Sequence, residues 1–85
     1  MYGQDFHMFD EELVHQTHME LDGTHYQIMV YCREDGRHFA KTHFNDKDII
    51  INDGLTMFDA LEKHKKILPL AITSRQLNKY RTSPI

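Results

Sequence analysis

The chain has 85 residues, enough for one small domain and too few for two. Hydrophobic residues make up 40% and charged residues 27%, a composition typical of folded globular domains and not of disordered chains. Lys and Arg total 10 against 13 Asp and Glu, a formal charge of -3 that argues against a general nucleic-acid or membrane-surface binder. We expect a single domain over residues 1–85, with flexible ends at 1–9 and 81–85.

Cysteine usage and hydropathy indicate in which cellular compartment the protein is expected. The single Cys32 cannot form an intramolecular disulfide and leaves no Cys-rich zinc site. No apolar run is long enough for a transmembrane helix, and the first residues lack the basic and apolar regions of a signal peptide. These observations predict a cytoplasmic protein without membrane contact.

The first hairpin is predicted by the pair Asp22-Gly23, which is typical of a type I′ turn between two strands. Apolar and polar residues alternate on both sides of it, and the turn places His15 opposite Val30 and Leu13 opposite Cys32. One face then collects the apolar residues Leu13, Met19, Leu21, Tyr26, Ile28, Val30 and Cys32. A register shift of one residue would destroy this segregation, so the pattern supports the register.

A second turn, Glu34-Asp35-Gly36, leads into residues 38–44. A two-residue turn would direct Lys41 into the apolar face, whereas a three-residue turn with Gly36 in the left-handed conformation pairs Arg33 with Arg37. Burying an unpaired ammonium group is costly, so we predict the three-residue turn and a three-stranded meander. The residues expected to face inward are Ala40, Thr42 and Phe44.

The rest of the chain predicts a helix. Residues 49–51 are a β-branched run, either a brief strand or an extended segment beside the core. Thr56 has the pattern of a helix N-cap. Helical spacing then connects Met57, Ala60, Leu61, His64, Ile67 and Leu68. Pro69 is expected to end or kink the helix. Residues 69–80 can continue the helix or form a further edge strand, with Ser74 able to cap a short turn.

The predicted fold class is α+β. A three-stranded antiparallel meander plus a short extended segment is covered on one face by a C-terminal helix, because a sheet this small is not stable alone.

Seven His are the unusual feature of the composition. His18, His25 and His43 fall on the polar sheet face and offer the nitrogen ligands that zinc or nickel binds, although their spacing matches no established ligand motif. Solvated surface His residues are the competing and favoured interpretation. His15 and His64 fall on the apolar side, where they could approach each other or sit at the core margin with one ring nitrogen hydrogen-bonded.

The chain lacks the motifs of an enzyme. It has no nucleophile elbow, no paired catalytic carboxylates and no Gly-rich phosphate loop. Cys32 has no arranged His and carboxylate partners and faces the apolar side, so it is predicted to be a core residue. The acidic residues between 46 and 53 lack the spacing of a calcium loop. We therefore expect neither an enzyme nor a cofactor.

Four apolar residues interrupt the polar sheet face: Val14, Met29, Tyr31 and Phe39. Exposed aromatic residues on a sheet can stack on RNA bases. Without surrounding basic residues they favour a protein partner or a second copy of the chain, and these four are the predicted partner-binding residues. The alternatives are a His-rich face that binds a divalent metal or nucleic acid, and a small folded domain whose residues imply no activity.

Two segments carry a family pattern. The first runs Asp53-Gly54-Leu55-Thr56-Met57-Phe58-Asp59-Ala60-Leu61 into the helix ending at Leu68, and the second is Glu34-Asp35-Gly36 followed by Phe39-Ala40. Together they resemble the HicB-like antitoxins, a family of small bacterial proteins, over roughly residues 26–68.

The resemblance implies a partial ribonuclease H-like fold in β-β-β-α-β order and a small ribonuclease toxin as the protein partner. It also implies repression of the operon through an appended DNA-binding segment. The chain departs from the family pattern where Asn45-Asp46-Lys47-Asp48 replaces a Pro-rich loop, and we expect no DNA-binding segment after Ile85.

Overall fold

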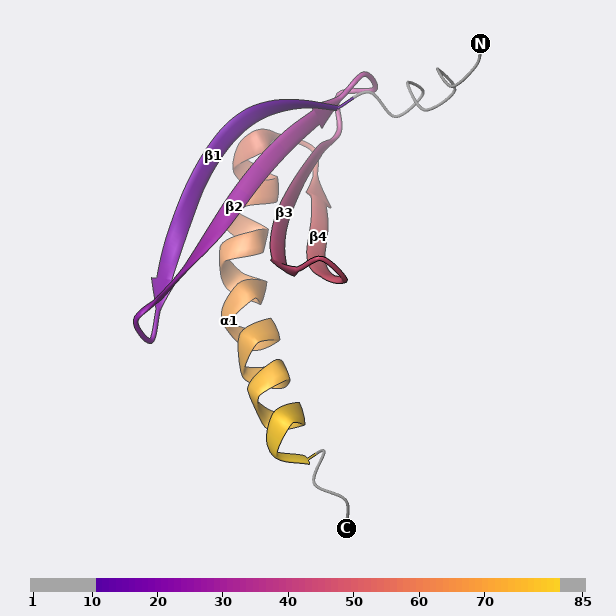
Figure 1. Cartoon of the computed structure of the whole chain (residues 1–85). Helices are drawn as coiled ribbons and strands as arrows, with labels where there is room; N and C mark the ends of the chain where they lie inside the picture. Colours follow the sequence, from indigo (N-terminus) through magenta and orange to yellow (C-terminus); the bar gives the residue numbers. More distant parts are fainter. Residues whose placement is uncertain (1–10, 82–85) are drawn as a thin grey trace.

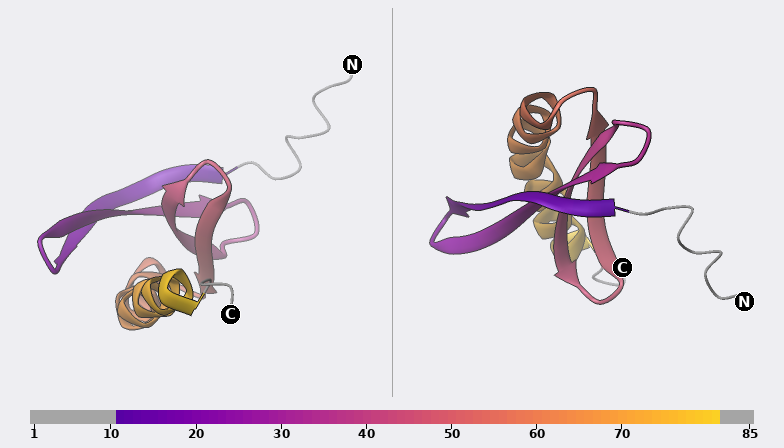
Figure 2. Two further views of the ribbon diagram at one scale, coloured as in Figure 1. Left: turned by 60° about the horizontal axis from the view of Figure 1, so that its bottom comes forward. Right: turned by 90° about the horizontal axis from the view of Figure 1, so that it is seen from above.

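The computed structural model describes residues 11–81, with side chains as far as Leu77. The elements are β1 (Glu11–Leu21), β2 (Thr24–Arg33), β3 (His38–Asn45), β4 (Asp48–Gly54) and α1 (Met57–Arg81). The strands form one antiparallel sheet in the order β1-β2-β3-β4, and α1 lies along one face of it (Figure 1, Figure 2). The predicted α+β class is confirmed, and residues 49–51 belong to a fourth paired strand.

The predicted flexible ends fall almost entirely outside this part of the chain. Residues 1–9 and 82–85 are not among those described, whereas Arg81 is the last residue of α1.

The first turn has the predicted type I′ geometry. Asp22 and Gly23 both have positive φ, 51° and 81°, as that turn requires. The predicted register then holds from Leu21 to His15, which faces Val30. Local turn chemistry therefore sets the pairing over most of β1.

A bulge near the start of β1 overturns one predicted pair. Val14 is an extra residue in the ladder, so Leu13 faces Tyr31 and not Cys32. Because one inserted residue moves the preceding side chains to the opposite face, Leu13 leaves the apolar face and is 46% exposed. The prediction that Leu13 belongs to the core face is wrong.

The second turn is the predicted three-residue turn. Gly36 has a φ of 89°, its N–H donates to the Arg33 carbonyl at 2.9 Å, and the Arg33 N–H donates to the Arg37 carbonyl at 2.9 Å. Ala40 and Thr42 consequently point toward α1 and are buried.

The core is a single layer between the sheet and α1. Its buried apolar residues are Ile28, Val30, Ala40, Ala60, Leu61, Leu68 and Ile72. Burying a Leu or Ile side chain contributes about 1.5–3 kcal/mol, so each member of so small a set matters to stability.

α1 begins where Thr56 predicts and continues past Pro69. The Asp59 N–H donates to Thr56 Oγ1 at 3.0 Å, which confirms the N-cap. The helix then runs through Pro69 to Arg81, so the continued helix is the observed alternative for 69–80, and neither an end at Pro69 nor an edge strand is found. Buried Leu68 and Ile72 flank the proline and hold the helix on the sheet. No helix within residues 11–81 is long and apolar enough to cross a membrane.

The packing of α1 also corrects the expectation for Ser74. That residue lies inside α1 and caps no separate turn. Within the described residues no strand follows the helix, so the final strand of the β-β-β-α-β order implied by the resemblance has no counterpart there.

β4 and the start of α1 approach each other closely. A Cβ atom on Gly54 would lie 2.5 Å from the backbone nitrogen of Ala60, so this position requires glycine. Asn52 Nδ2 donates to the Ala60 carbonyl at 3.0 Å across the same junction. These contacts place the first turns of α1 beside β4.

Candidate functional site

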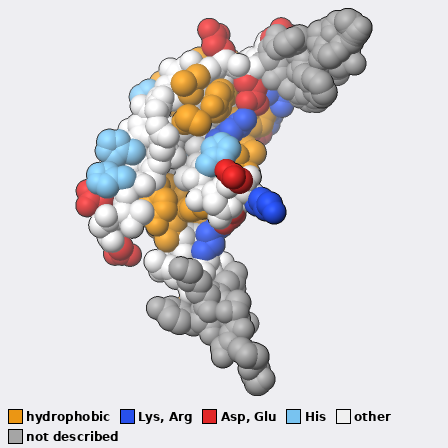
Figure 3. All heavy atoms as spheres, viewed as in Figure 1, with side chains coloured by type: hydrophobic (Ala, Val, Ile, Leu, Met, Phe, Trp, Pro, Cys, Tyr) orange, Lys and Arg blue, Asp and Glu red, His pale blue; other side chains and the backbone are white. Residues whose placement is uncertain are grey.

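An apolar surface occupies the face of the sheet that α1 leaves uncovered (Figure 3). Leu13 faces Tyr31 and Tyr31 faces Phe39, so the three side chains form a row across β1, β2 and β3. Met29 lies two residues from Tyr31, whose hydroxyl is 3.8 Å from its sulfur. With the bulge residue Val14 beside Leu13, we call this set the outer-face cluster: Leu13, Val14, Met29, Tyr31 and Phe39.

Strand pairing places three of the predicted partner-binding residues, Met29, Tyr31 and Phe39, on this face, and Val14 is included as the chain neighbour of Leu13. Met29, Tyr31 and Phe39 are half-buried by one another, and Val14 is 42% exposed in the bulge. Sequence reasoning missed Leu13, because nothing in the alternation of β1 reveals the extra residue.

Two further apolar residues of β4 were also missed. Ile49 and Ile51 face His43 and Lys41 of β3 on the outer side of the sheet and are exposed. The signal for them was present, since strand alternation in an Ile-Ile-Ile run sends the first and third side chains to the same face.

Charged side chains hold the aromatic rings of the cluster. Lys41 Nζ lies 4.6 Å from the centre of the Tyr31 ring and donates to Glu11 Oε1 at 2.7 Å. The Arg33 guanidinium lies 5.0 Å from the centre of the Phe39 ring. These cation–π contacts restrict the positions of both rings.

The basic residues around the cluster are paired with acids. Arg33 Nη2 is 3.5 Å from Asp35, and Arg37 forms an ion pair with Asp53. The hydrogen bond from Arg37 lowers the pKa of Asp53, and the same bond raises the pKa of Arg37. Since these cations are already neutralised, the face is poorly suited to a phosphate backbone.

The structure brings together two of the three predicted metal-binding residues. The rings of His18 and His25 are 5.3 Å apart at an angle of 46°, and His25 Nε2 is 3.7 Å from Glu20. His43 lies on β3 opposite Ile49. Among the side chains of residues 11–77, no group of three or more His, Cys, Asp and Glu is arranged to hold a metal ion.

His15 and His64, the two histidines predicted on the apolar side, do not form a pair. His64 is fully buried, and both of its ring nitrogens have partners: Nε2 is 2.7 Å from Thr42 Oγ1, and Nδ1 is 2.5 Å from Asn52 Oδ1. His15 is half-buried opposite Val30 on β2. Sequence reasoning placed Thr42 inward but had no signal for Asn52.

The network around His64 continues into the backbone. Thr42 Oγ1 donates to the Gln27 carbonyl at 2.8 Å, and Asn52 Nδ2 donates to the Ala60 carbonyl. Burial disfavours the charged imidazole and lowers the pKa of His64 from 6.5. The arrangement joins β2, β3, β4 and α1 inside the core, where it serves the fold and is closed to a substrate.

An open groove lies between α1 and the strands β2 and β3. Tyr26, Phe44, Ile72, Arg75 and Gln76 line it. All three guanidinium nitrogens of Arg75 donate: Nε and Nη2 to Asp48 at 2.7 and 2.6 Å, and Nη1 to the Ala71 carbonyl at 3.0 Å. Arg75 thus ties α1 to the start of β4.

Cys32 is a free, half-buried cysteine near the end of β2. It lines a groove there together with the first residues of β1. Its sulfur is 3.5 Å from the Arg33 carbonyl oxygen, and three glutamates, Glu11, Glu12 and Glu34, line the same groove. Cys32 therefore lies at the edge of the core and is not one of its fully buried residues.

A scan against protein-family models, a search of curated proteins and a search of solved structures found no match to this chain.

Proposed function

We propose that this protein is a non-enzymatic, cytoplasmic interaction module that binds a partner protein through the outer-face cluster. One observation carries the proposal: aromatic and aliphatic side chains are contiguous across three strands on the sheet face that α1 does not cover. A continuous apolar patch bordered by charged residues is typical of an interaction site and not of a solvated sheet face.

The chemistry of the cluster favours a protein over a nucleic acid. Tyr31 and Phe39 offer large contact areas at low conformational cost, since Lys41 and Arg33 already hold their rings. The same cations are the ones a polyanion would need. Their existing partners Glu11 and Asp35 would have to be displaced first.

The resemblance to HicB-like antitoxins indicates which partner to test first. In that family the partner is a small ribonuclease toxin, and a meander followed by a helix corresponds to part of the fold that the resemblance implies. A gene for such a toxin beside this one would make it the primary candidate.

The proposal is tested by substitutions in the cluster. Tyr31→Ala and Met29→Lys are compared with wild type in quantitative affinity purification, followed by titration calorimetry with the partner so identified. Because truncating a central aromatic contact costs about 2 kcal/mol or more, we expect the dissociation constant to rise by about thirtyfold or more.

The matched control is Leu70→Ala, which removes an exposed Leu from the solvent side of α1. Circular dichroism and thermal melts confirm that each variant is folded. The proposal is wrong if folded Tyr31→Ala and Met29→Lys proteins bind every partner as wild type does, or if Leu70→Ala weakens binding equally.

A divalent metal on the His18–His25 pair is the competing candidate, favoured by the proximity of the two rings and Glu20. Zinc titration of the chelator-treated protein decides between them. A stoichiometric site that disappears in His18→Gln would support metal binding, and the absence of any site tighter than about micromolar would end it.

A further inference from the structure

β4 is an unprotected edge of the sheet. The strand order places β1 and β4 at the two edges, where unpaired N–H and C=O groups can template another strand. β1 carries the bulge at Val14, a common protection against such pairing. β4 is regular: its register with β3 shows no shift from Ile49 to Gly54, and it contains no Lys, Arg or Pro.

The charges of β4 are already neutralised within the chain. Its charged side chains are Asp48 and Asp53, and each is held by an arginine, Arg75 and Arg37 respectively. Edge strands usually repel one another through unpaired charge, and here that repulsion is removed.

The exposed apolar residue at the centre of this edge is Ile51. It is the middle residue of Asp48–Gly54 and is 51% exposed on the outer side of the sheet. Two copies of β4 that pair antiparallel about Ile51 are related by a twofold axis at that residue. Such an axis is the symmetry of most protein dimers.

Such a pairing brings no like charges together. Ile51 would face the partner subunit's Ile51, and Ile49 would face the partner subunit's Asp53. Asp48 would face the partner subunit's Gly54, and Ile50 would face the partner subunit's Asn52. Every facing pair therefore contains at least one uncharged residue.

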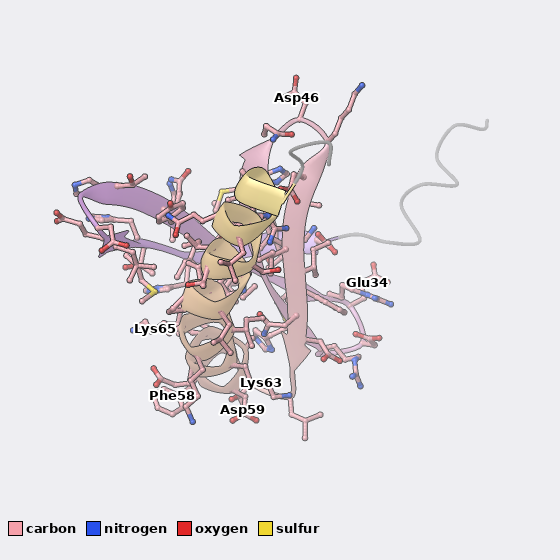
Figure 4. The ribbon with its side chains drawn as sticks, turned by 90° about the horizontal axis from the view of Figure 1, so that it is seen from below. Glu34, Asp46, Phe58, Asp59, Lys63 and Lys65 are labelled. Atoms are coloured by element: carbon pink, nitrogen blue, oxygen red, sulfur yellow. The ribbon has the colours of Figure 1, made fainter. Side chains whose placement is uncertain are left out.

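We propose that β4 pairs antiparallel with β4 of a second copy of this chain, through a twofold axis at Ile51. The two four-stranded sheets become one continuous sheet, and main-chain hydrogen bonds supply the affinity. Lys63 lies beside the end of β4 (Figure 4), where its ammonium group donates to the Asp53 carbonyl at 3.3 Å. A carbonyl oxygen has two lone pairs, so that of Asp53 can also accept from a main-chain N–H of the second copy.

The test is sedimentation velocity of the full chain over about two decades of concentration. We expect a monomer–dimer equilibrium for wild type. Ile51→Lys places two ammonium groups opposite each other and should raise the dimer dissociation constant by about tenfold or more. Mixing Ile51→Lys with Ile51→Glu should restore a dimer, because opposite charges then face across the axis.

Two further variants identify the register and the edge. Ile49→Lys faces the partner subunit's Asp53, so its dimer should be as stable as that of wild type. His18→Lys adds the same charge at an exposed residue of the other edge strand, outside the outer-face cluster, and should also leave the dimer intact.

A wild-type chain that stays monomeric at every concentration overturns the proposal, as does a dimer that Ile51→Lys leaves unchanged or that His18→Lys breaks. Circular dichroism establishes that each variant is folded. Since none of these variants removes Tyr31 or Met29, failure of the β4 interface is distinguishable from failure of the outer-face cluster.

Discussion

His64 links α1 to β3 and β4 through a side chain that water does not reach. A neutral imidazole carries one N–H, so it donates at one nitrogen and accepts at the other. Asn52 Oδ1 can only accept, so Nδ1 carries the N–H and Nε2 accepts from the Thr42 hydroxyl. The Gln27 carbonyl lies within reach of the same hydroxyl and competes with Nε2 for its single proton. Charging the ring would place a cation in the core, and this is why burial lowers its pKa.

This lowered pKa predicts a loss of stability in acid. Below about pH 6.5 the unfolded chain gains a proton on His64 that the folded chain does not, so the free energy of unfolding falls until the folded pKa is reached. Above that range both states are neutral and the contribution is complete. Urea denaturation at a series of pH values should show the decrease for wild type and a smaller one for His64→Gln.

His43→Gln is the control for this experiment, since His43 is exposed on β3. It should keep the wild-type pH dependence. If His64→Gln does not fold, an NMR titration of the His64 ring in wild type gives the folded pKa directly, and a value at or above the ordinary one contradicts the interpretation.

α1 shows how packing overrides a local rule at the scale of the element. Pro69 removes the N–H that the Lys65 carbonyl would accept and costs about 3 kcal/mol in a helix interior. Leu68 and Ile72 on either side of it are buried against the sheet, and their burial offsets that cost. The helix therefore continues where the residue alone predicts an end.

Pro69→Ala should stabilise the protein. Restoring the missing hydrogen bond and removing the ring clash should raise the free energy of unfolding by about 1–3 kcal/mol. In a domain of this size each kcal/mol corresponds to about 4–8 °C in Tm, which differential scanning calorimetry resolves. The exposed neighbour Leu70, changed to Ala, should alter Tm little. A lower Tm for Pro69→Ala would show that packing of the proline ring contributes more than the hydrogen bond it prevents.

At the scale of the whole molecule, two separate surfaces remain outside the single core layer. The outer-face cluster spans β1 to β3, and the free edge of β4 lies beyond Lys41 and His43 on the same sheet. α1 covers only the opposite face, so the architecture leaves both surfaces open at once.

We expect the two surfaces to act independently. Tyr31→Ala should raise the partner dissociation constant by about thirtyfold or more while changing the dimer dissociation constant by no more than about twofold to threefold. The reason is that β3 separates Tyr31 from Ile51, and substitutions at distant sites are nearly additive. Ile51→Lys should do the reverse. Calorimetry with the partner and sedimentation of the same two variants measure both, and a variant that loses both properties would show a single shared interface.

The predictable part of the candidate site was the part that lies in regular strands. Met29, Tyr31 and Phe39 share a face because their strands pair in the register that the two turns impose. Leu13 was assigned to the wrong face because the alternation of residues in β1 does not reveal the bulge at Val14. The partners of His64 could not be assigned, since Asn52 meets it only after β4 and α1 pack together.

By itself the sequence determined the two hairpins, the division of residues between two sheet faces and the start of α1. These depend on interactions within a few residues: positive φ at Gly23 and Gly36, strand alternation and the Thr56 cap. Only the tertiary structure decided the bulge at Val14, the pairing of β4 with β3 and the passage of α1 through Pro69. Each of these is a balance between a local cost and burial against a distant element, and that balance exists only once the sheet and helix are in contact.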